Sequence, residues 1–160
     1  MTGIFRQSAA LLLCIGVCFA AAAIGAAFTS PNVPGWYENL NKPPWTPPSW
    51  VFGPVWSLLY LLMGISAWLV WRRTGLGAAV LPLTLFGIQL LLNVAWSVLF
   101  FGLRSPGAAL IDIVLLWFAI LATVIAFWWR SAPAAWLMLP YLAWVSFAVA
   151  LNLAIWNLNR

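Results

Sequence analysis

The sequence predicts an all-α integral membrane protein, folded as a bundle of five transmembrane helices with a long Pro/Trp-rich loop between helices 1 and 2. Of its 160 residues, 66% are hydrophobic and 6% are charged, whereas a soluble domain has about 25% charged residues. Disordered chains are poor in apolar and aromatic residues, so disorder is excluded as well. Five spans of about 20 residues fit the chain and leave room for one polar connection.

The first predicted span covers about residues 7–28, where an Ala-rich apolar run follows Arg6 and stops at Ser30-Pro31. A cleaved signal peptide is the alternative, but the run is long for one. The second span covers about 50–71 and ends at a pair of arginines. Charges just outside an apolar run are typical of a membrane surface.

Three further spans follow at about 78–102, 107–129 and 134–157. The breaks between them contain Thr-Gly, Arg-Ser-Pro and Arg-Ser-Ala-Pro, and are only a few residues long. Breaks this short make neighbouring helices antiparallel. We expect a single membrane domain over residues 1–160 with its two termini on opposite sides.

The segment 30–49 is the one long connection and contains six prolines with several aromatic residues. The prolines prevent a continuous helix and restrict the loop to few shapes. A rigid aromatic loop of this length is typical of a lid over a binding site. A simple anchor at the membrane interface is the alternative.

The charges exclude some functions and leave the orientation open. Four basic residues fall on one predicted side and three on the other, which does not decide the cytoplasmic side. They are scattered, which argues against nucleic acid as a partner. No His is present, and Cys14 and Cys18 have no second pair to complete a metal site, so we expect no metal.

Polar and aromatic residues converge in the half of the bilayer nearest the loop 30–49. Helical spacing places Trp56 and Tyr60 on one face of the second span. One stripe on the third span contains Gln89, Asn93, Trp96 and Phe100, and one on the fifth contains Tyr141, Trp144, Ala148 and Asn152. Polar groups at this depth indicate either a ligand cavity or hydrogen bonds between packed helices.

The residue types bound the ligand class. Flat Trp and Tyr side chains suit a large, planar, apolar molecule such as a tetrapyrrole or a sterol. No serine has a histidine partner for hydrolysis. Asp112 is the single acid within a span, and reaching the interface or pairing with Arg104 would explain it. Trp117 lies near mid-span with no polar neighbour, which predicts packing.

The combined motifs resemble one known family. They are Trp36-Tyr37-x-x-Leu40-x-Lys42-Pro43-x-Trp45-x-Pro47-Pro48, Val55-Trp56 with Tyr60, Gln89-x-x-x-Asn93-x-x-Trp96-Ser97-x-x-Phe100-Phe101, and Pro140-Tyr141-x-x-Trp144 with Leu151-Asn152. Together they are similar to the translocator protein / tryptophan-rich sensory protein family (TspO/MBR, the peripheral benzodiazepine receptor family). The resemblance covers essentially the whole chain in the right order. It implies a five-helix bundle, a homodimer and a porphyrin- and drug-binding cavity beneath the first loop.

By resemblance, Tyr37 and Pro47 are lid positions that contact ligand, and Asn93 and Ala148 line the pocket. Trp56 and Trp144 match the cavity tryptophans implicated in porphyrin photodegradation in bacterial members. Asp112 matches an acidic position seen in several members, and the C-terminal sterol motif of animal members is missing here. Helix faces and resemblance together predict this ligand-binding set: Tyr37, Pro47, Trp56, Tyr60, Gln89, Asn93, Trp96, Trp144 and Ala148.

The sequence therefore predicts a membrane receptor or carrier for protoporphyrin-like tetrapyrroles, with no required cofactor and with porphyrin as ligand. The expected partners are a planar hydrophobic small molecule, the lipid bilayer and a second copy of the chain, in a bacterial membrane. The enzymatic alternative is light- and oxygen-dependent porphyrin degradation, with Trp56 and Trp144 as redox-active residues. A stress-related scaffold with incidental ligand binding is a third hypothesis.

Overall fold

The computed structural model describes residues 2–160, so Met1 of the predicted domain lies outside the described residues. The helices are α1 (Thr2–Thr29), α2 (Phe52–Ser97), α3 (Pro106–Trp128) and α4 (Ala132–Leu158), joined by short helical turns η1 (Ser30–Asn32), η2 (Val33–Tyr37), η3 (Ser49–Val51) and η4 (Val98–Gly102). Within the described residues the chain contains no strand. The predicted fold class is confirmed.

Five segments are long and apolar enough to cross a membrane, and they are named spans one to five here: Gly3–Tyr37, Ser49–Gly75, Gly77–Gly102, Pro106–Trp128 and Ala132–Leu158. Spans two and three both belong to α2, which reverses direction at Gly75. Gly75 has φ 69° and ψ 178°, a conformation that a residue without a Cβ adopts freely. As helices, the spans satisfy their own backbone hydrogen bonds, as a lipid environment requires.

The predicted boundaries are close for spans two to five but wrong for the first. Helical structure continues past residue 28 through η1 and η2, so only about half of the predicted loop 30–49 is irregular. Pro31 and Pro34 are tolerated because each stands in the first turn of its short helix, where no backbone N–H is needed. The chain still bends at Pro34 and Gly35, whose dihedral angles are not helical. We call residues 30–48 the lid.

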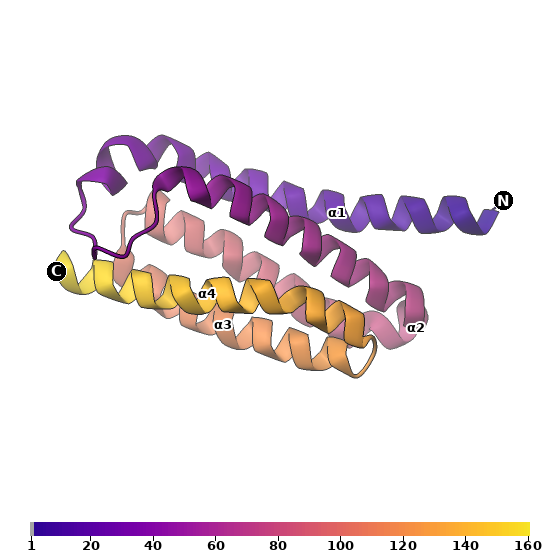
Figure 1. Ribbon diagram of the computed structural model, residues 1–160. Helices are drawn as coiled ribbons and strands as arrows, with labels where there is room; N and C mark the ends of the chain where they lie inside the picture. The colour runs from indigo at the N-terminus through magenta and orange to yellow at the C-terminus, as the bar shows by residue number, and fades with distance from the viewer. Residues whose placement is uncertain (1) are drawn as a thin grey trace.

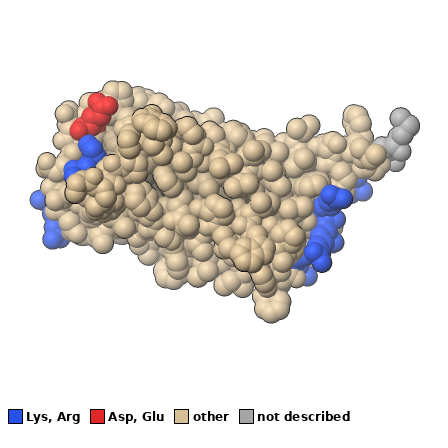
Figure 2. Space-filling model, in the orientation of Figure 1, with Lys and Arg blue, Asp and Glu red and all other residues tan. Residues whose placement is uncertain are grey.

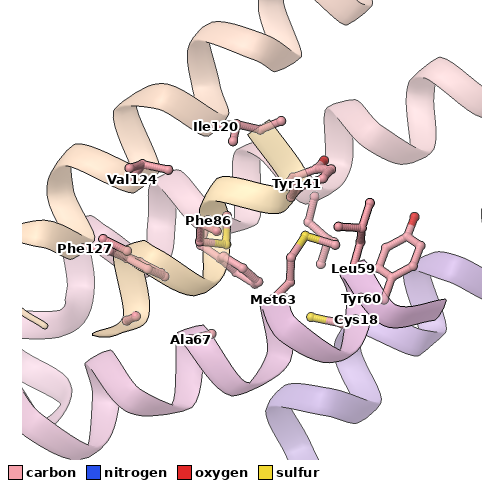
Figure 3. Packing of buried hydrophobic residues seen from close by; sticks show 14 of the residues in the cluster. Cys18, Leu59, Tyr60, Met63, Ala67, Phe86, Ile120, Val124, Phe127 and Tyr141 are labelled. Carbon is pink, nitrogen blue, oxygen red and sulfur yellow. The ribbon is translucent and has the colours of Figure 1, made fainter. Parts of the chain in front are cut away.

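The spans pack as an antiparallel bundle (Figure 1). α1 lies along α2, α3 lies beside α4, and the N- and C-termini are at opposite ends, as an odd number of spans requires. The lid is at the same end as the C-terminus. Buried side chains from all five spans meet in the core shown in Figure 3, including Cys18, Met63, Phe86, Phe127 and Tyr141.

The charged side chains visible in Figure 2 lie at the two ends of the molecule, and the surface between them carries none in this view. At these ends, arginines lie over tryptophan rings. Arg72 is 5.0 Å from the Trp68 ring centroid and Arg160 is 5.3 Å from that of Trp156. Amphipathic side chains in this arrangement anchor a protein at both membrane interfaces. The protein is a multi-pass integral membrane protein.

The structure corrects one detail for each of two residues inside the bundle. Asp112 is buried and does not pair with Arg104, whose guanidinium instead donates to Asn32. Trp117 packs against the core as predicted, but it does have a polar neighbour, because its indole N–H donates to Ser146 Oγ at 2.8 Å. That contact joins α3 to α4 and depends on how the two helices are rotated, which spacing along one helix does not reveal.

Candidate ligand-binding cavity

A cavity of about 680 Å³ lies beneath the lid. Its walls come from α1, the lid, the lid-side ends of spans two and three, and α4. Ligand sites usually have volumes of about 300–1,000 Å³, so this cavity can hold a whole small molecule. All of its lining residues are uncharged, and aromatic side chains form much of its surface.

Seven of the nine predicted ligand-binding residues line this cavity: Tyr37, Trp56, Tyr60, Asn93, Trp96, Trp144 and Ala148. They come from four segments that are far apart in the sequence, so the folded bundle brings together what helical spacing and depth predicted. The two tryptophans singled out from the resemblance, Trp56 and Trp144, belong to this set. Their contact with a ligand remains a prediction.

Gln89 and Pro47 do not line the cavity. Gln89 is on the predicted stripe but one helical turn deeper than Asn93, where it is fully buried and its amide nitrogen lies 3.9 Å from Met63 Sδ. The cavity ends above it. Pro47 is in the irregular part of the lid, beyond the helical part that covers the cavity. Neither residue is brought to the site in this structure.

Hydrogen bonds link three spans at the floor of the cavity. The Tyr60 hydroxyl donates to Asn93 Oδ1, and Asn93 Nδ2 donates to the Tyr141 hydroxyl at 3.0 Å. Trp56 lies against both tyrosines, with ring centroids 5.6 Å from Tyr60 and 6.1 Å from Tyr141. All three hydrogen-bonded residues are buried, so water does not compete for these bonds.

A second polar bridge supports another wall. The indole N–H of Trp96 donates to Asn152 Oδ1 at 3.0 Å, and Asn152 Nδ2 donates to the Pro106 carbonyl at 2.8 Å. The bridge connects span three, α4 and the start of α3. Trp96 is also stacked on Phe100, with centroids 5.1 Å apart. The orientation of Trp96 is therefore fixed from both sides.

Trp144 of α4 belongs to an aromatic cluster at the cavity. Its ring centroid is 6.0 Å from that of Phe52 and 5.6 Å from that of Phe147. Trp45 of the lid contacts the same Phe147 ring at 5.7 Å, which connects the lid to this cluster. The Trp144–Phe52 and Trp45–Phe147 pairs are edge-to-face, and such pairs add to the stability that apolar burial provides.

The helical part of the lid is held by one lysine. Lys42 Nζ donates to the carbonyls of Tyr37, Glu38 and Leu40 at 2.7, 2.8 and 3.1 Å. These carbonyls lie at or just beyond the end of a helical segment, where i to i+4 backbone partners are missing. The Tyr37 carbonyl also accepts from the Leu40 N–H at 3.3 Å. The same ammonium lies 5.0 Å from the centroid of the Tyr37 ring. Lys42 thereby fixes the backbone and the ring of a residue that lines the cavity.

Two further contacts fasten the lid to the bundle. Asn41 N–H donates to Asn159 Oδ1 at 3.0 Å, and Asn159 Nδ2 donates back to the Asn41 carbonyl at 2.9 Å. At the other end of the lid, Arg104 donates to Asn32 Oδ1 through Nε at 3.2 Å and Nη2 at 3.0 Å. We call the Asn41–Asn159 pair the clasp. It closes the lid onto the C-terminal end of α4.

Comparison with known proteins agrees with this arrangement. The sequence pattern of the TspO/MBR family matches residues 14–157. The chain belongs to the TspO/MBR family.

Relatives within the TspO/MBR family include bacterial and animal proteins. The Tryptophan-rich protein TspO of Chlorobaculum tepidum is 46% identical over 158 residues, covering 96% of this chain and 98% of that protein. The human Translocator protein is 45% identical over 139 residues, covering 86% and 82%. The Tryptophan-rich sensory protein of Cereibacter sphaeroides is 37% identical over 151 residues, covering 94% and 92%.

Sequence reasoning did not predict the contribution of α1 to this TspO/MBR cavity. Small α1 side chains form one wall, namely Ala22, Ala23, Gly25 and Ala26, and Thr29 follows one turn later. Their helical spacing was visible as an Ala-rich face, but such faces are also typical of helix packing. Phe52, Phe147 and Asn152 also line the cavity and were not in the predicted ligand-binding set.

Proposed function

We propose that this protein is a membrane receptor or carrier that binds planar tetrapyrroles of the protoporphyrin type beneath its lid. The observation that supports the proposal most is the uncharged aromatic cavity of about 680 Å³, with Trp56 and Trp144 among its lining residues. Indole and phenol rings offer flat faces on which a planar apolar molecule stacks. The lid provides a means of retaining it.

The absence of charge in the cavity lining bears on how such a ligand would bind. A carboxylate buried without a charged or hydrogen-bonding partner is strongly disfavoured. The proposed pose therefore places the apolar ring in the cavity and leaves acidic substituents at its open side. Protoporphyrin IX dimethyl ester, which lacks the charges, is expected to bind at least as well as the free diacid.

The names of the relatives fit a receptor or carrier without specifying a ligand. One relative is named a sensory protein and another a translocator protein. Both names describe proteins that detect or move something. The proposal that the ligand is a porphyrin is supported by the aromatic cavity and by the resemblance in the sequence motifs.

Titration with protoporphyrin IX tests the proposal, with tryptophan emission as the signal and the protein in lipid nanodiscs. We expect saturable quenching and a clear loss of affinity in the Trp56→Phe, Trp144→Phe double variant. Trp129→Phe is the matched control, because Trp129 is 80% exposed and outside the cavity. Wild-type protein that does not bind protoporphyrin would refute the function, and unchanged affinity in the double variant would refute the site.

The enzymatic alternative is favoured by one observation, the contact of Trp56 with two tyrosine rings at 5.6 and 6.1 Å. In this reaction dioxygen is the oxidant: the photoexcited porphyrin gives an electron to dioxygen through the Trp56 ring, which relays it and ends unchanged. Both oxygen atoms then add across one methine carbon–carbon double bond, which breaks to give two carbonyl groups and opens the macrocycle. Illumination of the complex in air should then produce a new bilin-like absorption band that is absent in Trp56→Phe. Equal bleaching with free tryptophan would reject the alternative.

Assembly and location complete the proposal. We propose a homodimer that needs no cofactor, in a bacterial membrane. The human and Chlorobaculum relatives are similar to the chain at nearly equal identity, 45% and 46%, so identity alone does not separate a bacterial from an animal source. Mass measurement of the protein in nanodiscs tests the dimer directly.

A further inference from the structure

We infer that Asn93 is a positioning residue, which sets the orientation of Trp56 through two tyrosines and does not hydrogen-bond the ligand itself. The inference rests on the proposed function, since its role is to prepare the cavity for a planar molecule. It also changes the interpretation of Asn93, which the sequence suggested as a polar group available to a ligand.

Both polar atoms of the Asn93 side chain already have one partner each. Its Oδ1 accepts from the Tyr60 hydroxyl and its Nδ2 donates to the Tyr141 hydroxyl at 3.0 Å. The side chain is 2% exposed, so a ligand in the cavity meets little of it. A ligand that took one of these bonds would leave a buried tyrosine hydroxyl without its partner, which costs more than the new bond returns.

The two tyrosines define where the Trp56 ring lies. Tyr60 is one helical turn beyond Trp56 on the same face, and their rings are tilted by 34° at 5.6 Å. Tyr141 approaches from α4 edge-on, at 66° and 6.1 Å. Trp56 is thus confined by one ring from its own helix and one from a different span.

Asn93 fixes the spacing between those two rings because it lies between their hydroxyl groups. The three residues come from spans two, three and five, so one amide determines how three helices meet at the floor of the cavity. Tyr141 is 0% exposed and does not line the cavity. Any effect of Tyr141 on ligand binding must therefore act through its neighbours.

The Tyr141→Phe variant isolates this effect, since it removes one buried hydroxyl and keeps the ring. Without that acceptor, Asn93 Nδ2 is unpartnered and the amide is free to turn away from Tyr60. Asn93→Leu removes both bonds at similar side-chain volume. Ser66→Ala is the matched control, because it removes a buried bond between span two and α4, from Ser66 Oγ to the Ala134 carbonyl at 2.7 Å, away from the cavity.

The experiment records the indole ¹H–¹⁵N signal of Trp56 in ligand-free protein, assigned by its loss in Trp56→Phe, and the affinity for protoporphyrin IX. We expect the signal to shift in Tyr141→Phe and Asn93→Leu but not in Ser66→Ala. We expect protoporphyrin affinity to fall about fivefold or more in the first two variants, which is the value of one buried hydrogen bond.

The outcomes separate this inference from the proposed function. An unshifted Trp56 signal in Tyr141→Phe overturns the positioning role, whether or not protoporphyrin binds. A shifted signal in protein that binds no protoporphyrin supports the positioning role and refutes the proposed function. Equal shifts and equal affinity losses in Ser66→Ala would show a general loosening of the bundle and would also overturn the inference.

Discussion

The clasp gives a quantitative prediction about the lid. Asn159→Ala removes two hydrogen bonds between the lid and α4, from Asn41 N–H at 3.0 Å and to the Asn41 carbonyl at 2.9 Å. Each bond of this kind contributes about 0.5–1.5 kcal/mol, and exposure to water puts these two near the lower end. The loss is therefore about 1–2 kcal/mol, which raises the open fraction of the lid by a factor of about 5–30.

Hydrogen exchange at the Asn41 amide measures this opening, because that N–H is itself one of the donors. We expect exchange to accelerate by about 5–30-fold in Asn159→Ala, and release of bound protoporphyrin in stopped flow to accelerate with it. Asn41→Ala is an informative control. The clasp uses the backbone of Asn41, and its side chain adds only a long 3.5 Å contact to the Leu158 carbonyl.

The contrast between the two asparagines is what the clasp predicts. Asn41→Ala changes the lid partner of the clasp but keeps its backbone. It should therefore leave hydrogen exchange at the residue-41 amide and the release of protoporphyrin nearly unchanged. A second control is Asn157→Ala, an exposed position near the same end of α4. Unchanged exchange in Asn159→Ala, or an equal acceleration in Asn41→Ala, would show that the clasp does not hold the lid.

Three further predictions concern other parts of the structure. A Cβ at Gly64 would lie 2.8 Å from Ile15 Cα, so Gly64→Ala should destabilise the bundle by about 1–3 kcal/mol. A Cβ at Gly87 would have nothing within 4 Å, so Gly87→Ala should stabilise its helix. Thermal unfolding in nanodiscs should show a lower melting temperature for the first variant and a higher one for the second. The buried Tyr37 hydroxyl has no partner among the described residues, so Tyr37→Phe should leave the melting temperature of the ligand-free protein unchanged or higher, and a lower one would contradict this. Lys42→Met removes the donor to three carbonyls, which should destabilise the closed lid by about 1–2 kcal/mol and expose it to proteolysis. Lys42→Arg keeps a donor there, so its lid should be cleaved more slowly than that of Lys42→Met.

Much of the cavity could be predicted because helix periodicity and membrane depth are local properties. Trp56, Trp96 and Trp144 lie on different spans, yet counting residues from the lid end places Trp56 and Trp96 at the same level and Trp144 about two helical turns deeper. Because successive spans cross the membrane in opposite directions, the lid end of each span is known, and depth is counted from that end. This reasoning requires no knowledge of how each helix is rotated, only that polar faces turn away from lipid.

The errors arise where rotation and exact depth matter. Gln89 shares the face of Asn93, but the cavity closes between them and Gln89 packs against Met63 instead. The clasp joins residues 118 positions apart, and neither asparagine belongs to a local pattern that would single it out. The α1 wall escaped prediction because alanines that line a cavity look the same in sequence as alanines that let helices approach.

A structure of the protein with protoporphyrin IX bound in a lipid environment tests the central proposal most directly. The proposal predicts the tetrapyrrole ring in the cavity beneath Tyr37, against Trp56 and Trp144, with its carboxylates at the open side and the Asn93 hydrogen bonds intact. A ring bound on the lipid-facing surface, with the cavity unoccupied and the lid unchanged, would contradict it.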